Sequence, residues 1–148
     1  MGHEVFSPSL DGCGERAHQL RSGITNDSHA RELAELLRYE DLNEVVLVGT
    51  SSGGMVLSRT AELARDRIGR VVFADALALF NGEAISDHVT RRDPMITDTG
   101  TGPRPDDARH RLFAELEPDI LEWALERTTL HPRSVMEDPI ELESFWDQ

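Results

Sequence analysis

A serine at the end of an apolar run is the residue of this chain best placed to do chemistry. Ser51 follows the run Val45-Val46-Leu47-Val48 and stands at the centre of Gly49-Thr50-Ser51-Ser52-Gly53, which has the G-x-S-x-G spacing. Between a strand and a helix, this spacing is typical of a nucleophile elbow, a turn that exposes the serine Oγ. We therefore predict that Ser51 is a nucleophile.

The residues beside Ser51 predict how such a turn is built. Gly49 and Gly53 lack Cβ atoms, so strand and helix can approach closely while the serine takes a strained φ/ψ. The N–H of Ser52, at the start of the following helix, is predicted to stabilise a developing oxyanion with help from the helix dipole. Gly-Ser-rich turns also bind phosphate, but a phosphate loop carries Gly-Lys-Ser/Thr and this chain contains no lysine.

A serine nucleophile needs a general base, and the candidates are the histidines. They are His3, His18, His29, His88, His110 and His131. A lone histidine in a polar stretch is more often a surface residue than a catalyst. We select His88, because it follows Asp75, the residue that ends a second apolar run on the side of the sheet where ligands bind.

Alternating strands and helices are predicted to position these residues. Apolar residues recur with helical spacing after Asp27, at Ala30, Leu33, Ala34 and Leu37. The runs Val45–Val48 and Val71–Ala74 are continuously apolar, and Val5–Phe6 forms a shorter run before them. This pattern favours an α/β fold with a mostly parallel sheet that is buried on both faces and carries flanking helices.

The second half of the chain has a different character. Residues 91–107 are rich in Arg, Asp, Pro, Gly and Thr, which predicts a mobile loop without regular structure. We expect helices from Arg109 to Glu117 and from Pro118 onward. The acidic end, Glu137–Gln148, is predicted to be a solvated tail, although the pair Phe145-Trp146 could dock on the rest of the molecule.

Composition excludes several classes of function. The chain has 148 residues and is expected to form a single domain over residues 1–148. Its net charge of −13 disfavours nucleic acid and anionic membrane surfaces as partners.

The only cysteine, Cys13, permits no intramolecular disulfide and is interpreted as a plain loop thiol. No secretory signal or membrane-spanning run is present, so we expect a soluble, cytoplasmic protein.

Several segments together resemble a known family. They are Gly2-His3-Glu4-Val5-Phe6-Ser7-Pro8-Ser9-Leu10, Gly12-x-Gly14-Glu15-Arg16, the helix from Asp27, Asp41-Leu42 with Val45-Val46-Leu47-Val48-Gly49, Ser51-x-Gly53-Gly54-Met55-Val56, and Arg67-Ile68 with Val72-Phe73-Ala74-Asp75-Ala76. The chain is similar to the central part of the α/β-hydrolase superfamily, in the branch of plant esterases, hydroxynitrile lyases and bacterial esterases. Relatives in this branch carry His where this chain has Thr50, and a large residue where it has Ser52.

The resemblance implies a truncated hydrolase core over residues 1–80, which carries the elbow, and a helical cap remnant within residues 81–148. It makes Ser51 the nucleophile and the Ser52 N–H one oxyanion donor. Asp75 lies where some hydrolases of this fold place their acid, although an aspartate that caps a turn is an equal alternative. No histidine matches the family's catalytic position, and the family's His-Gly loop, which supplies the second oxyanion donor, is not found in this chain.

The implied function is hydrolysis of a small carboxylic ester through Ser51. A non-catalytic or split relative that lacks the catalytic histidine is the alternative. A hydroxynitrile lyase-like activity, with the same serine as a base, is a further alternative. The resemblance implies no metal and no organic cofactor.

The resemblance also predicts assembly. In the family, a strand lies between the equivalents of Val5–Phe6 and Val45–Val48, and this chain does not supply it. Unpaired strand edges leave backbone donors and acceptors unsatisfied. We therefore expect a homo-oligomer, most simply a dimer, or a complementing chain.

Overall fold

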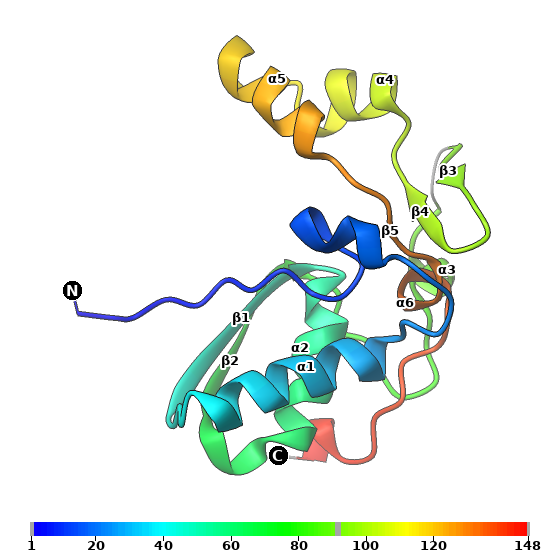
Figure 1. The fold of residues 1–148 in the computed structure, drawn as a ribbon. Coiled ribbons are helices and arrows are strands. Elements are labelled where there is room, and N and C mark those ends of the chain that lie inside the picture. Colours follow the sequence, from blue (N-terminus) through cyan, green and yellow to red (C-terminus); the bar gives the residue numbers. More distant parts are fainter. Residues whose placement is uncertain (1, 91–92, 148) are drawn as a thin grey trace.

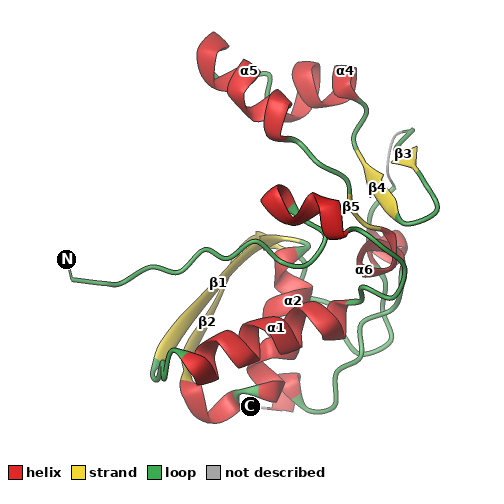
Figure 2. Cartoon of the chain, viewed as in Figure 1, coloured by secondary structure: helices red, strands yellow, loops and turns green. Residues whose placement is uncertain are grey.

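The structure, a computed structural model, describes residues 2–90 and 93–147. The first elements are η1 (Gly14–Gln19), α1 (Asn26–Tyr39), β1 (Val45–Ser51), α2 (Gly53–Leu63), η2 (Arg65–Arg67) and β2 (Ile68–Ala76). They are followed by α3 (Ile85–His88), β3 (Met95–Ile96), β4 (Gly100–Gly102), α4 (Pro105–Asp107), η3 (Ala108–Leu112), α5 (Pro118–Arg127), β5 (His131–Pro132), α6 (Arg133–Glu137) and η4 (Phe145–Asp147). Figures 1 and 2 show their arrangement.

The first half of the chain forms a parallel strand pair and two helices. Strands β1 and β2 run in parallel with Val48 opposite Val72. Helix α2 leaves the end of β1 and packs against both strands, and α1 packs on α2 (Figure 1). The α/β class and the positions of these four elements agree with the sequence prediction. A reciprocal capping box, in which Thr25 and Ser28 bond each other's backbone N–H, starts α1 at Asn26.

The prediction that the sheet is buried on both faces is wrong. Alternate residues of the strands point away from α2, so Val46, Val48 and Val72 are 49%, 66% and 41% exposed. The continuous apolar runs are typical of strands covered on both sides, yet only one face of this pair is covered by the described elements.

The predicted strand at Val5–Phe6 does not form. The side chain of Val5 is 83% exposed, and the N-terminal segment runs outward from the body of the molecule (Figure 1). An extended, β-branched segment becomes a strand only when a neighbouring strand accepts its backbone hydrogen bonds, and β1 pairs with β2 alone among the described residues.

The second half of the chain contains a small antiparallel sheet. Strands β3, β4 and β5 pair in that order, and α4 covers Pro105–Asp107, so the loop prediction for 91–107 is wrong for these residues and for Met95–Ile96 and Gly100–Gly102. The side chain of Leu130 packs over Gly100 and helps to bury the middle strand. Arg91 and Arg92 lie outside the described residues.

The later helices agree with the prediction in part. The expected helix Arg109–Glu117 is replaced by α4 and the π-helical turn η3, which begin earlier and end at Leu112. Helix α5 begins at Pro118, as predicted. Among the described residues, no helix combines the length and apolar character that crossing a membrane requires.

The prediction of a solvated tail is also wrong. Ile140 and Leu142 are buried in a cluster with Met55, Leu79 and Ile85. The carboxylate of Glu62 on α2 accepts hydrogen bonds from the N–H groups of Glu143 and Ser144, and Trp146 Nε1 donates to the carbonyl of Leu79. The expectation that Phe145 and Trp146 could dock is therefore confirmed.

Candidate active site

Ser51 occupies a strained turn between β1 and α2. It is the last residue of β1, and α2 begins two residues later at Gly53. Its φ is 49°, in the left-handed region that a non-glycine residue rarely adopts. Its carbonyl accepts a hydrogen bond of 2.9 Å from the N–H of Leu77, which holds the turn against the end of β2. The strand, turn, helix sequence and the backbone strain are those of a nucleophile elbow.

Two glycines make the turn possible, and only one of them was assigned correctly from the sequence. A Cβ on Gly49 would lie 2.2 Å from Leu57 Cδ2 and 2.8 Å from the Gly53 carbonyl oxygen. A Cβ on Gly54 would lie 2.2 Å from the carbonyl oxygen of Leu77. Nothing lies within 4 Å of a Cβ on Gly53. The close approach of α2 to β1 and to the chain after β2 therefore needs Gly49 and Gly54. The presence of a second glycine directly after Gly53 was the signal in the sequence for the role of Gly54.

Ser52 directly precedes α2 and takes the N-cap position. Its φ and ψ of −61° and −17° are already helical, so its N–H belongs to the positive end of the helix dipole. This placement is what an oxyanion donor requires, because the donor must be fixed before charge develops. The role itself stays a prediction.

Asp75 lies at the same end of the strand pair as Ser51. Ser51 is in register with Ala76, the residue after Asp75. Asp75 has a φ of 51°, so both candidate residues occupy strained backbone at the carboxyl ends of adjacent strands. Its side chain is exposed to solvent. The structure brings Ser51 and Asp75 together, while the role of Asp75 as an acid stays a prediction.

His88 is not brought to Ser51 by any contact among the described residues. It ends the short helix α3 and is largely exposed. Its Nε2 lies 3.3 Å from a carboxylate oxygen of Glu83. A carboxylate partner is what orients a catalytic imidazole, so the His88–Glu83 pair has the chemistry of a base and its orienting group. Its assignment as the base of Ser51 stays a prediction.

His29 has a structural role that the sequence did not predict, since it was named only among the candidate bases. It is fully buried on α1, and its Nε2 lies 2.8 Å from the Asp11 carbonyl oxygen. Burial lowers the pKa of His29, and its Nδ1 has no partner among the described residues. Its ring meets that of His131 edge-on, with 6.0 Å between the centroids. The signal was its place beside Ala30 on the apolar face of α1.

The only cysteine and the metal-ligating side chains are two further candidates for a site. Burial raises the pKa of the Cys13 thiol, so this cysteine is less nucleophilic than a free one, in line with its interpretation as a loop thiol. Within residues 2–90 and 93–147, no group of three or more His, Cys, Asp or Glu residues could hold a metal ion.

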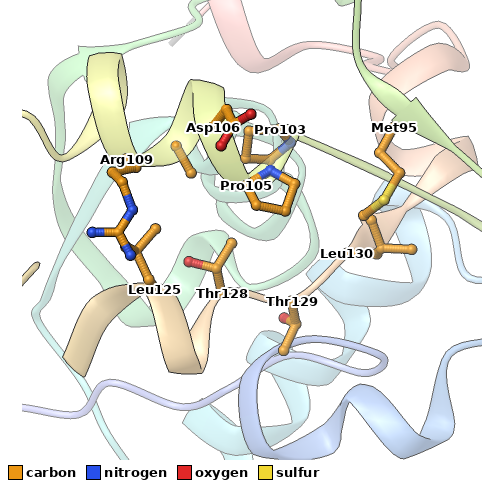
Figure 3. A pocket seen from close by; sticks show the side chains of 10 residues that line it. Met95, Pro103, Pro105, Asp106, Arg109, Leu125, Thr128, Thr129 and Leu130 are labelled. Carbon is orange, nitrogen blue, oxygen red and sulfur yellow. The ribbon is translucent and has the colours of Figure 1, made fainter. Parts of the chain in front are cut away.

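Two cavities lie in the second half of the chain. One of about 400 Å³ is lined by Met95, Pro103, Pro105, Asp106, Ala108, Arg109, Leu125, Thr128, Thr129 and Leu130 (Figure 3). The other, of about 570 Å³, has Thr101, His131 and Met136 on its walls. Ser51 lines neither cavity, so we do not assign either of them to the chemistry at the elbow. Arg109 at the smaller cavity is paired with Glu122, which neutralises it as an anion ligand.

Comparisons with known proteins agree with this geometry. The chain is 34% identical over 84 residues to a carbendazim hydrolyzing esterase from Nocardioides, an alignment that covers 57% of this chain and 35% of the esterase. The structure superimposes on an extracellular α/β-hydrolase from a Paenibacillus species with a TM-score of 0.81 and 18% identity, over 99% of this chain and 62% of the other.

A methylesterase from Arabidopsis, MES16, matches with a TM-score of 0.68 and 23% identity, over 90% of this chain and 56% of the other. The chain thus spans about a third of the length of the curated esterase and less than two thirds of each of these solved structures. The model of the alpha/beta hydrolase family matches residues 1–147. With a strained serine between a parallel strand and a helix and a match over nearly its whole length, this chain belongs to the α/β-hydrolase family.

Proposed function

We propose that this chain carries the nucleophile of a serine hydrolase that acts on a small carboxylic ester. The observation that carries the proposal is the left-handed φ of Ser51 at the junction of β1 and α2. Strain of this kind is retained where it serves a function, since it costs about 1–3 kcal/mol. Similarity to the carbendazim hydrolyzing esterase supports ester-type substrates. The single cysteine fits a reducing compartment, so we include a cytoplasmic location in the proposal.

In the proposed reaction, Ser51 Oγ attacks the ester carbonyl carbon and a base accepts its proton. The carbonyl oxygen becomes an oxyanion, which the Ser52 N–H stabilises at the N-terminus of α2. Collapse of the tetrahedral intermediate expels the alcohol, which takes the proton back from the base, and leaves an acyl group on Ser51. Water, deprotonated by the same base, then hydrolyses this acyl group and restores Ser51. His88 is the proposed base and Asp75 the proposed acid, and binding of substrate would have to bring His88 to Ser51.

A second candidate function is that of a non-catalytic or split relative. It is favoured by the position of His88, whose partner is Glu83 and which makes no contact with Ser51 or Asp75 among the described residues. In that case the elbow is kept as a folding element, because the turn joins β1, α2 and the end of β2. A complementing chain would then have to supply the base.

Labelling with a fluorophosphonate probe tests the nucleophile directly. We expect the probe to modify Ser51, as located by peptide mass spectrometry, and hydrolysis of p-nitrophenyl acetate to be slow. Catalysis without a complete triad can still exceed the rate in water by about a thousandfold, so a weak rate alone does not show a triad. Ser51→Ala should abolish both the label and the serine-dependent rate.

Ser86→Ala is the matched control, because Ser86 is an exposed serine on α3. It should leave the label in place. If Ser51 is not labelled at any probe concentration that labels a serine esterase, the non-catalytic function is favoured. A fast reaction with a stoichiometric burst that His88→Ala abolishes would establish His88 as the base.

A further inference from the structure

Asn81 and Gly82 are the central residues of a tight turn that follows β2. The N–H of Glu83 closes this turn with a hydrogen bond of 3.1 Å to the Phe80 carbonyl oxygen. Gly82 has a φ of 83°, in the left-handed region that glycine occupies readily. Because glycine has no side chain, nothing on Gly82 shields its backbone nitrogen from the side-chain amide of Asn81. An Asn-Gly pair is therefore well suited to deamidation.

Deamidation at such a pair begins with a cyclisation. The backbone nitrogen of Gly82 gives its proton to a base and attacks Cγ of Asn81. The new N–C bond closes a succinimide ring, and the bond from Cγ to the side-chain nitrogen breaks, so that this nitrogen takes up a proton and leaves as ammonia. Water then opens the ring at one of its two carbonyl groups. The product is aspartate or isoaspartate, in which the main chain runs through Cβ and Cγ.

In the folded chain, one segment occupies both reacting groups. The Gly82 N–H donates a hydrogen bond of 2.9 Å to the Ile140 carbonyl oxygen, and Asn81 Oδ1 accepts one of 2.9 Å from the Leu142 N–H. The Ile140 N–H also donates to the Glu83 carbonyl oxygen at 2.8 Å. An N–H group that is bonded to a carbonyl oxygen is shielded from base, and a side-chain amide held by a donor cannot turn freely toward the nitrogen. The docked segment therefore protects the Asn-Gly pair.

A small apolar cluster holds this segment in place. Ile140 and Leu142 are 1% and 6% exposed, and they pack with Met55, Leu79 and Ile85. A segment held by two apolar anchors opens locally at a lower free energy than the whole domain needs to unfold. Protection of the Asn-Gly pair consequently depends on local docking.

We propose that Asn81 is a deamidation site whose reaction is controlled by the docking of residues 140–142. Each local opening frees the Gly82 nitrogen and the Asn81 amide together, so the rate follows the population of the open form. Isoaspartate adds a methylene group to the main chain inside the turn, which displaces the Gly82 N–H from the Ile140 carbonyl. The modification therefore prevents the segment from docking again. This inference is independent of whether Ser51 is catalytic.

Mass spectrometry of the full chain during incubation in mildly alkaline buffer tests the proposal. Conversion of Asn81 should be at least about tenfold slower in the native chain than in the same chain unfolded in urea. Ile140→Ala should raise the native rate at least about tenfold, because the loss of buried methyl groups weakens docking. Glu141→Ala is the matched control, since Glu141 lies in the same segment with an exposed side chain. It should change the rate less than about twofold.

Two comparisons separate docking from other causes. Asn43 precedes Glu44, whose side chain hinders ring closure, so Asn43 should stay unmodified in every variant. Glu62→Ala removes an acceptor that holds the same segment on α2, so it should also speed the conversion of Asn81. This second variant keeps the test independent of the stability of Ile140→Ala, and circular dichroism checks that both variants are folded.

The product form tests the consequence for docking. The isoaspartate form, separated by ion exchange, should show faster hydrogen exchange at residues 140–147 than the unmodified chain. Asn81→Asp carries the same added charge without the extra methylene, and its carboxylate can still accept from the Leu142 N–H, so its segment should stay docked. A native chain that deamidates as fast as in urea, an unchanged rate in both Ile140→Ala and Glu62→Ala, or an isoaspartate form with unchanged exchange would each overturn the proposal.

Discussion

Gly54 is predicted to be the least replaceable glycine of the elbow. In Gly54→Ala the new methyl would lie 2.2 Å from the Leu77 carbonyl oxygen, so the backbone after β2 must move away from α2. We expect the free energy of unfolding to fall by about 1–3 kcal/mol, the usual cost of overpacking. Urea denaturation followed by circular dichroism measures the change.

Gly53→Ala provides the comparison on the adjacent residue. Its methyl would meet no atom within 4 Å, so alanine should be neutral or stabilise by up to about 1 kcal/mol through the unfolded chain. Equal losses of stability in the two variants would show that the approach of Leu77 to α2 is not as close as described.

At the scale of single residues, the sequence predicts what local spacing determines. Ser51 could be placed because the strand, the turn and the helix around it are all local signals. Gly54 and His29 could not be understood in the same way. Their environments are formed by Leu77 and Asp11, which approach only after the chain has folded. For His88, the sequence order suggests a place on the ligand side of the sheet, which stays a prediction, and it gives no sign of the partner Glu83.

Glu62 is predicted to be the anchor of the C-terminal segment. Its side chain is almost fully buried and joins Arg59 to the N–H groups of Glu143 and Ser144. Although burial acts to raise the pKa of Glu62, these hydrogen bonds outweigh it and lower the pKa, so the group is ionised in the folded protein at neutral pH. Glu62→Ala should cost about 1–3 kcal/mol, because two backbone donors lose their acceptor.

Hydrogen exchange checks this prediction by position. In Glu62→Ala the amides of residues 140–147 should exchange faster, while those of α1 should not. Glu141→Ala is the control, because Glu141 lies in the same segment and its side chain is exposed. Unchanged exchange in Glu62→Ala would mean that apolar packing of Ile140 and Leu142 alone holds the segment.

Elements defined by their own pattern were predicted well, and elements defined by a distant partner were not. The spacing of apolar residues predicts helix α1, and the β-branched runs predict β1 and β2. The run at Val5–Phe6 has the same local character as β1, but the structure gives it no neighbour. Strand β4 has almost no strand propensity and forms because β3 and β5 flank it.

The stability of the whole molecule should decrease between neutral and mildly acidic pH because of His29. Burial lowers its pKa in the folded state, while in the unfolded chain it titrates near 6.5. Above that pH both states hold a neutral imidazole. As the pH falls below it, only the unfolded chain binds the proton, so unfolding becomes easier until the lowered folded-state pKa is passed. The opposing charges nearby are Glu32 and Asp11, with Arg16 acting in the same direction as burial.

Urea unfolding at pH 7.5, 6.5 and 5.5 measures this slope. His29→Gln should flatten it even if the variant is less stable at every pH. His18→Gln, at an exposed histidine of η1, should keep the wild-type slope. The lowered pKa of Asp27, where two arginines outweigh the effect of burial, affects stability only at lower pH and does not interfere. A flat wild-type profile would contradict the burial of a neutral His29.

The two tryptophans of the chain report on different regions of the molecule. Trp146 stacks on Phe73 with 6.2 Å between ring centroids, while Trp123 lies on α5, next to Arg127. Departure of the C-terminal segment would remove the contact with Phe73 and expose the rest of the Trp146 side chain, which is 43% exposed when docked, so its emission should shift to longer wavelength. The emission of Trp123, which is already 58% exposed, would hardly change. In Trp123→Phe, the tryptophan fluorescence therefore comes from Trp146 alone and reports whether the C-terminal segment is docked, without any attached dye.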